Sequence, residues 1–302
     1  MSSSSDVTAE SFDSSRVARS ATHLTQPFFW SVRRELWENR SIYIAPPAVA
    51  AVALLGFLIS TLTGRFALAT THKQQALTLP YDFAAGVIML TTMAVGVFYS
   101  IETLYGERRD RSVLFWKSLP VSDLTTVLSK AIVPIFILQF IGFAVTVALQ
   151  FVMLTLSSAM LLGRGQSPAT LWSEIAFFEM SLMLLYHLFT IHMLWHAPIY
   201  SWLLMVSAWS RRVPFLWAVL PPLAIIAIEK LAFNTSHFAH LLGYRFMGGA
   251  ESMTMGDDMP IHPGTHLTPA RFLGTPGLWI GLVVAAAFLL AAVRLRRYRG
   301  PI

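Results

Sequence analysis

The sequence contains no cysteine and few charged residues. Without cysteine, a disulfide framework, a cysteine nucleophile and a thiolate metal site are all excluded. Charged residues make up 13% of the 302 positions and apolar residues 55%, whereas soluble domains carry about 25% and about 45–50%. A water-soluble globule of this size needs more polar surface. The composition therefore excludes an ordinary cytosolic enzyme, a fibre and a disordered chain, and it predicts an all-α polytopic membrane protein.

Several motifs that carry catalytic or nucleotide chemistry are also missing. The sequence has no Gly-x-x-x-x-Gly-Lys-Ser/Thr phosphate loop, no His-Glu-x-x-His zinc motif and no Gly-x-Ser-x-Gly nucleophile turn. We therefore expect no catalysis, no bound cofactor and no metal in this chain, and nothing indicates a nucleic-acid partner.

The first 25 residues are rich in Ser, Thr and Asp and lack the 7–15-residue apolar core of a signal peptide. This composition predicts a disordered cytoplasmic tail over 1–25, followed by one membrane domain over 26–302.

Six stretches approach the roughly 20 apolar residues that a helix needs to cross a bilayer. The fourth is longer than one crossing requires, and Pro198 is expected to kink it. In the fifth, Pro221 and Pro222 are expected to break or bend the helix. The predicted spans cover residues 42–62, 83–104, 131–157, 175–207, 213–233 and 277–293.

The basic residues indicate how these spans are oriented. If the amino terminus lies inside, sixteen of the 22 Lys and Arg residues fall in inside segments. This bias predicts that both termini are cytoplasmic, in a multi-pass protein of a cell membrane, by expectation the bacterial inner membrane. The external segment 234–276 is then long enough for short external or re-entrant helices.

The segment 26–40, just before the first span, has the pattern of an amphipathic helix lying in the membrane interface. Phe29, Val32 and Leu36 recur at helical spacing on its apolar face. A generic lipid anchor is the simpler interpretation of the same pattern. The residues expected at headgroup depth and beside it are Trp30, Arg33, Arg34 and Trp37.

The segment 106–130, between the second and third spans, begins with mixed charges and continues with an apolar patch over 113–119. Pro120 is expected to end a short helix, and Ser122 to cap a new helix that runs through Lys130. An apolar knob beside positive charge suits docking on another protein. The alternative is that it lies on the lipid surface.

This segment resembles the loop between spans 2 and 3 in type-2 permease subunits of ATP-binding-cassette (ABC) transporters. That loop carries an acidic residue, a Gly-Thr pair, a leucine-rich turn, Leu-Pro-Val/Ile-Ser and a later Lys. Here Glu107 supplies the acid, and Arg111-Ser112 replaces Gly-Thr. The matching positions are Leu119, Pro120, Val121, Ser122 and Lys130. The layout of an interfacial helix, six spans and a long external segment before the last span is also similar.

The resemblance implies that 108–120 is a coupling helix, which docks on a separate ATP-hydrolysing subunit, and that 26–40 is the elbow helix. ATP and magnesium would bind to that subunit. A second copy of the chain, or a related permease, would complete an exporter surrounded by membrane lipids. The residues expected to couple to the ATPase are Glu107, Arg108, Arg111, Leu114, Trp116, Leu119 and Pro120.

Polar residues in the fourth span suggest other readings. Glu179, Tyr186 and His187 share one side of an ideal helix and could line a translocation path. A proton-coupled secondary transporter using Glu179, His187 and Glu229 is the alternative function. The inverted repeats that such transporters commonly show are not visible.

Other polar positions have simpler interpretations. His192 and His196 could supply two zinc ligands of an intramembrane metalloenzyme, but position 193 is Met, and hydrogen bonding between helices is favoured. An ion pair with Arg108 or Arg109 is expected for Glu102. Near the outer end of the fifth span, Glu229 is expected to extend outward with Lys230.

Overall fold

The computed structural model describes residues 25–63, 74–118, 121–246 and 272–299. All regular elements in these ranges are helical, and six helices are long and apolar enough to cross a membrane. The predicted all-α polytopic membrane fold is confirmed. The predicted tail over 1–25 lies outside the described residues except for Thr25. The six helices are Ser41–Leu62, Thr78–Arg109, Asp123–Gly163, Ala169–Trp195, Pro214–Phe233 and Pro276–Tyr298.

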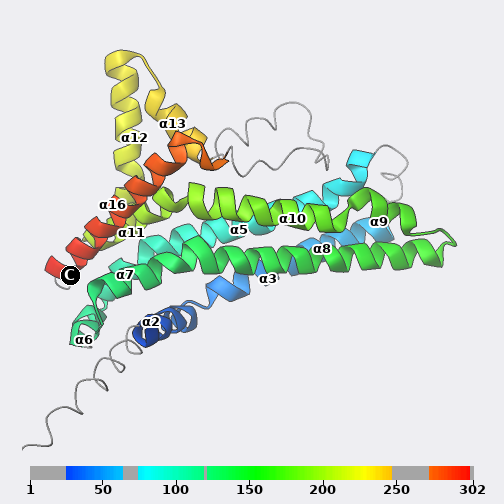
Figure 1. Cartoon of the computed structure of the whole chain (residues 1–302), viewed down its shortest axis with the longest axis horizontal. Helices are drawn as coiled ribbons and strands as arrows, with labels where there is room; N and C mark the ends of the chain where they lie inside the picture. Colours follow the sequence, from blue (N-terminus) through cyan, green and yellow to red (C-terminus); the bar gives the residue numbers. More distant parts are fainter. Residues whose placement is uncertain (1–24, 64–73, 119–120, 247–271, 300–302) are drawn as a thin grey trace, which may run out of the picture.

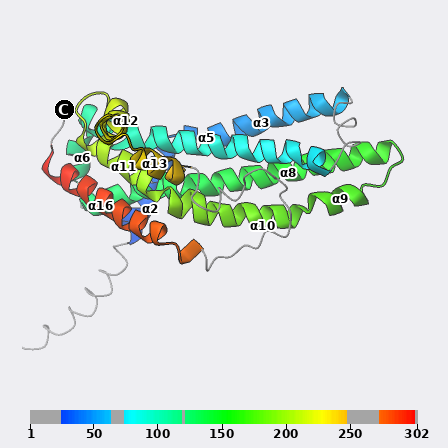
Figure 2. The ribbon, with the colours of Figure 1, turned by 90° about the horizontal axis from the view of Figure 1, so that it is seen from above.

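Long helical rods form the body of the molecule (Figure 1). One rod joins three segments without interruption, and another places four segments end to end. Figure 2 shows α3 and α10 at opposite edges of this bundle, with α5 and α8 between them. The rods are α3 (Ser41–Leu62), α5 (Gln74–Arg109), α7 (Asp123–Ile132) with η1 (Val133–Ile137) and α8 (Leu138–Gly163), and α9 (Ala169–Ile175) with α10 (Phe177–His187), η2 (Leu188–Trp195) and α11 (Ala197–Trp209).

Three further helices gather at one end of the bundle (Figure 1). They are α2 (Thr25–Glu38), α6 (Ser112–Ser118) and the last turns of α16 (Pro276–Tyr298). The predicted cap of the helix after α6 is confirmed, because the Ser122 hydroxyl accepts a hydrogen bond from the Thr125 backbone N–H at 3.0 Å. This cap fixes where the chain turns back into the bundle.

The fourth predicted span is not one helix, which corrects the expectation for 175–207. Ala176 adopts a left-handed conformation (φ 44°) and separates α9 from α10. The segment η2 is π-helical, and the chain breaks at His196 before α11 begins with Pro198 in its first turn. The disruption expected at Pro198 is confirmed. The break at Ala176 was not predicted, because no proline adjoins it in the sequence.

The fifth span is α12 (Pro214–Phe233), and it projects from one end of the bundle (Figure 1). Of the two outcomes expected at Pro221 and Pro222, a break does not occur, because the helix continues through both residues. Pro222 cannot donate to the carbonyl of Ala218, four residues earlier. That carbonyl instead accepts a hydrogen bond from the Trp202 indole N–H at 3.1 Å. The tertiary contact thus satisfies the backbone group that the proline leaves free.

The chain returns to the bundle through α13 (His237–Phe246), which is held by one guanidinium. Arg245 donates to the Gly277 carbonyl at 2.7 Å and lies 4.2 Å from the centre of the Trp195 ring. A Cβ atom at position 281 would lie 2.5 Å from the Arg245 Nη2 atom. Glycine at 281 therefore makes the space that this side chain fills.

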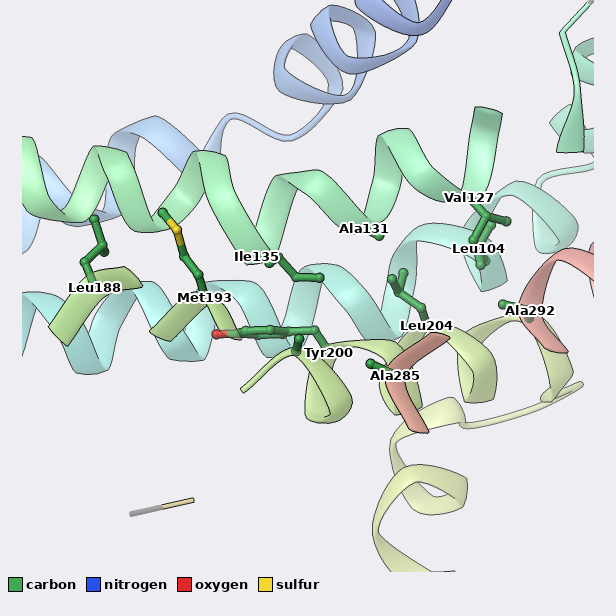
Figure 3. Packing of buried hydrophobic residues seen from close by; sticks show 12 residues of the cluster. Leu104, Val127, Ala131, Ile135, Leu188, Met193, Tyr200, Leu204, Ala285 and Ala292 are labelled. Carbon is green, nitrogen blue, oxygen red and sulfur yellow. The ribbon is translucent and has the colours of Figure 1, made fainter. Parts of the chain in front are cut away.

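The largest buried apolar cluster lies where α11 meets α5, α7, η2 and α16 (Figure 3). Small side chains of α16, Ala285 and Ala292, are buried in it beside Tyr200 and Leu204 of α11. This packing positions the end of α16 near α6 and α7. The buried members are Leu104, Val127, Ala131, Ile135, Leu188, Met193, Ala197, Tyr200, Leu204, Ala208, Ala285 and Ala292.

The contact between α5 and α8 provides a test of this packing. A Cβ atom at Gly142 would lie 2.5 Å from Cγ2 of the buried Thr92, whereas one at Gly86 would meet nothing within 4 Å. We expect Gly142→Ala to lower the stability in detergent by about 1–3 kcal/mol through overpacking. The measurement is denaturant unfolding monitored by tryptophan fluorescence.

Gly86→Ala is the matched control and should change little. Thr92→Ser removes the obstructing methyl group, so the double variant should recover most of the loss. A double variant that is no more stable than Gly142→Ala would contradict this packing.

Candidate functional site

Six charged side chains meet at the end of the bundle where α2 and α6 lie. Three are acidic and three are basic, and they come from α2, α5, α7 and α16. We call this set the charge network: Arg34, Glu35, Glu107, Asp123, Lys130 and Arg296. Outside this set, the exposed Glu38 also pairs with Arg34 at 3.6 Å. The pairing of opposite charges matters, because an uncompensated ion in a buried position is costly.

Glu35 is at the centre of the network and is 1% exposed. Its Oε1 lies 2.7 Å from Lys130 Nζ and 2.7 Å from Arg34 Nη2. Its Oε2 accepts hydrogen bonds from the hydroxyls of Tyr99 at 2.8 Å and Thr103 at 3.3 Å. Both oxygens are therefore satisfied, and the elbow segment α2 is fixed to α5 and α7.

Glu107, at the end of α5, connects this centre to α16. Its Oε1 lies 3.1 Å from both Arg34 Nη2 and Lys130 Nζ. Its Oε2 lies 3.3 Å from Arg296 Nη2, and Arg296 Nη1 lies 2.6 Å from Asp123 Oδ1. A single carboxylate thus joins three cations from three helices.

The electrostatics keep Glu35 and Arg34 ionised at neutral pH. Burial alone would raise the pKa of Glu35, but the adjacent Lys130 and Arg34 lower it to about 2. Burial also acts to lower the pKa of Arg34, and the carboxylates of Glu35 and Glu107 raise it overall. The carboxylate and the guanidinium are therefore held as structural ions and not as groups poised to exchange protons.

The short helix α6 is attached to the network from outside. The Arg34 guanidinium carbon lies 3.7 Å from the centre of the Trp116 ring. Lys117 donates to the backbone carbonyls of Arg297 at 3.3 Å and Arg299 at 3.5 Å, on the last turn of α16. Trp116 therefore faces inward. The exposed apolar side chains are Leu114 and Phe115, at 58% and 60%.

The other residues expected to couple to a partner have different positions. Arg108 is buried and donates to the carbonyls of Ala208 and Ser210 at 2.7 and 3.0 Å. Arg111 is exposed and forms the turn before α6 in a left-handed conformation, φ 60°. Leu119 and Pro120 lie outside the described residues. The ion pair expected for Glu102 is confirmed with Arg109, at 2.9 Å.

The elbow segment α2 has two dissimilar faces. Arg33 lies over the exposed rings of Trp30 and Trp37, 5.2 and 4.7 Å from their centres. Of its apolar side chains, Phe29 is 60% exposed, whereas Leu36 packs against a buried cluster of the bundle. Glu35 is the most buried residue of the helix, and the cations of the network compensate its carboxylate.

Residues of the fourth span do not converge on one site. The rings of Tyr186 and His187 are in contact at 5.9 Å, and His187 Nδ1 lies 2.9 Å from the Met183 carbonyl. Glu179 is exposed, and it forms no hydrogen bond or ion pair within the described ranges.

Of the two histidines with possible zinc-ligand spacing, His196 contacts α13. The rings of His192 and His196 are 5.6 Å apart, and His196 Nε2 lies 3.2 Å from the Phe246 carbonyl. In the part of the chain that the structure describes, no three His, Asp or Glu side chains are placed to hold a metal ion.

Glu229 does not extend outward with Lys230, which corrects that expectation. Its carboxylate accepts hydrogen bonds from the Thr235 hydroxyl at 2.9 Å and from the backbone N–H groups of His237 and Phe238 at 2.6 and 2.8 Å. It therefore caps the first turn of α13.

Sequence reasoning missed Glu35, Asp123 and Arg296, and it noted Lys130 only as a motif match. A signal was present for Glu35, because it is the one acidic residue between Val32 and Leu36 on the face predicted to be apolar. Nothing in the sequence pairs it with Lys130, which is 95 positions away.

The chain was also compared with known proteins: no family model, no curated protein and no solved structure matches it.

The charge network predicts strongly coupled mutational effects. We expect Glu35→Gln and Lys130→Met each to destabilise the protein by about 3–5 kcal/mol, because each leaves a buried ion with one partner fewer. The double variant should lose clearly less than the sum of the two. Unfolding in detergent measures all three, and Glu102→Gln, in an exposed ion pair, should cost no more than about 1 kcal/mol. Additive losses would show that the two groups do not interact.

The pKa of Glu35 predicts how the docking of α2 depends on pH. The pKa is about 2 in the folded protein, below its usual value of 4.5. When α2 separates from the bundle, the carboxylate binds protons more readily, so its stabilising effect is complete above about pH 4.5 and is lost as the pH falls toward 2. Pepsin cleavage within α2 between pH 5 and 2 measures this opening.

Glu35→Gln provides the comparison for the pepsin experiment. It should open more readily at pH 5 and show a smaller further change on acidification. Parallel curves for the two proteins would exclude Glu35 as a source of the pH dependence.

Proposed function

We propose that this chain is the membrane permease subunit of an ABC transporter that works as an exporter. The observation that carries the proposal is the arrangement of α6. This short helix presents Leu114 and Phe115 outward and is tied on its inner side to three helices by Trp116, Lys117 and the adjacent Glu107. An exposed apolar knob with rigid internal connections is suited to receive force from a docked partner.

The connections suggest how the motion would be transmitted. A displacement of α6 would reach α2 through the stacking of Arg34 on Trp116, and α7 and α16 through Glu107 and its cations. Buried ion pairs resist separation, because each ion would lose its compensation. The helices at this end would therefore move as one body while the spans reorient.

The proposal includes the partners. A separate nucleotide-binding subunit would bind ATP and magnesium and hydrolyse the nucleotide, and this chain would perform no catalysis. A second copy of the chain or a related permease would complete the transporter. In this arrangement α2, α6 and both termini lie on the cytoplasmic side of a cell membrane, by expectation the bacterial inner membrane, and the exposed tryptophans of α2 contact lipid headgroups.

The proton-coupled alternative has less support. It requires Glu179, His187 and Glu229 to exchange protons along one path. The Glu229 carboxylate is already occupied as the cap of α13, and Glu179 and His187 make no contact with each other.

Docking through α6 can be tested with the ATP-binding subunit that the proposal requires, whose gene we expect beside that of this chain. We expect Leu114→Ala/Phe115→Ala to weaken co-purification of that subunit by about tenfold or more, because central apolar contacts dominate binding. Leu90→Ala/Phe98→Ala, which removes equally exposed side chains of α5, is the matched control and should bind normally. Normal association of the α6 double variant, or the absence of any associating ATPase, would contradict the proposal.

A further inference from the structure

Glu179 differs from the other acidic residues described above in its surroundings. The acids of the charge network are paired with cations, and Glu229 is occupied by three donors. Glu179 is exposed on α10 and has no hydrogen-bond or ion-pair partner in the described ranges. It also follows directly after the left-handed break at Ala176, which starts α10 anew.

Contacts with α8 establish the level of Glu179 along the bundle. The Trp172 indole N–H donates to the Ser158 hydroxyl at 2.9 Å, and the ring centres of Phe177 and Phe151 are 5.8 Å apart. Since the two helices run antiparallel, Glu179 lies about two residues, roughly 3 Å, beyond the level of Phe151. The sequence of α8 is uncharged from 138 to 163, and that of α3 from 41 to 62.

A charged carboxylate within a spanning helix costs free energy unless a cation or a hydrogen-bond donor compensates it. Insertion scales give about 2.5–3.5 kcal/mol for a charged residue at the centre of a spanning helix, and the cost is smaller toward either end. The position of Glu179 in the first turn of α10 recovers about 0.3–1 kcal/mol through the helix dipole. An ionisable side chain within a spanning helix and without a partner in the described ranges is therefore a candidate binding residue.

A second copy of the chain would not provide that compensation if Glu179 lay near the two-fold axis. In a two-fold dimer about the membrane normal, a residue near the axis faces its own equivalent at the same depth. Two copies of Glu179 would oppose like charges, which disfavours both. A cation from outside the protein removes this conflict.

The side chains around Glu179 indicate what kind of cation fits. Phe178, which precedes Glu179 in the sequence, is 81% exposed. Leu182, one turn after Glu179, is 58% exposed. Aromatic faces with one carboxylate favour an organic cation over a strongly hydrated metal ion, because ring faces attract a cation and bury its apolar groups.

We propose that the Glu179 face of α10 binds the positive group of the transported molecule, and that the substrates are lipophilic organic cations. The inference extends the proposed exporter function and rests on it for the statement that the ligand is transported. Binding itself does not depend on the ATPase and can be measured without it.

The test measures binding of radiolabelled tetraphenylphosphonium to the full-length chain in lipid nanodiscs without ATP. Triphenylphosphine oxide serves as the uncharged probe. We expect Glu179→Gln to weaken binding of the cation by about tenfold or more and to leave the uncharged probe unchanged. Glu179→Asp should retain most of the affinity, and Phe178→Leu should lose several-fold.

Asp82→Asn is the matched control, because Asp82 also lies in a span but its carboxylate is engaged by Thr78. It should bind the cation normally. Absence of cation binding by the unmodified chain, equal binding by Glu179→Gln, or an equal loss of both probes would overturn the inference. Leu114→Ala/Phe115→Ala distinguishes the two proposals, because it should lose the ATPase and still bind the cation.

Discussion

The ion pair between Glu35 and Lys130 is the interaction on which this end of the molecule depends. Neither ion can be buried alone, because desolvation of an uncompensated charge exceeds what any single contact returns. Lys130 also reaches Glu107, and Glu107 reaches Arg296. Once Glu35 is buried, α2, α5, α7 and α16 must therefore end close together.

This constraint explains why α6 has a defined position although it is only seven residues long. Isolated helices of that length are unstable in water, so tertiary contacts must hold it. Arg34 and the end of α16 provide them through Trp116 and Lys117. The outer side of α6 then remains available, and the proposed docking of an ATPase uses that side.

The carboxylates of this protein have two kinds of surroundings. In the network, every carboxylate has a cation within 3.3 Å. On α10, Glu179 follows the exposed Phe178 and has no cation within the described ranges. The first arrangement gives rigidity, since removing any partner is costly. The second leaves a carboxylate whose charge the proposed ligand would compensate. Glu179 lies in the fourth span, whose backbone is irregular at the break at Ala176 and in the π-helical segment η2.

The sequence by itself determined which segments become apolar helices, the cap at Ser122 and the interruption at Pro198, because these depend on residues within a few positions of one another. The tertiary structure alone decided that Glu35 is buried, since its partner is 95 positions away. It also decided that α12 passes through two prolines, since Trp202 supplies the donor that the Ala218 carbonyl lacks. Local pattern specifies a helix, but only the packed chain determines which polar groups find partners and which, like Glu179, find none in the described ranges.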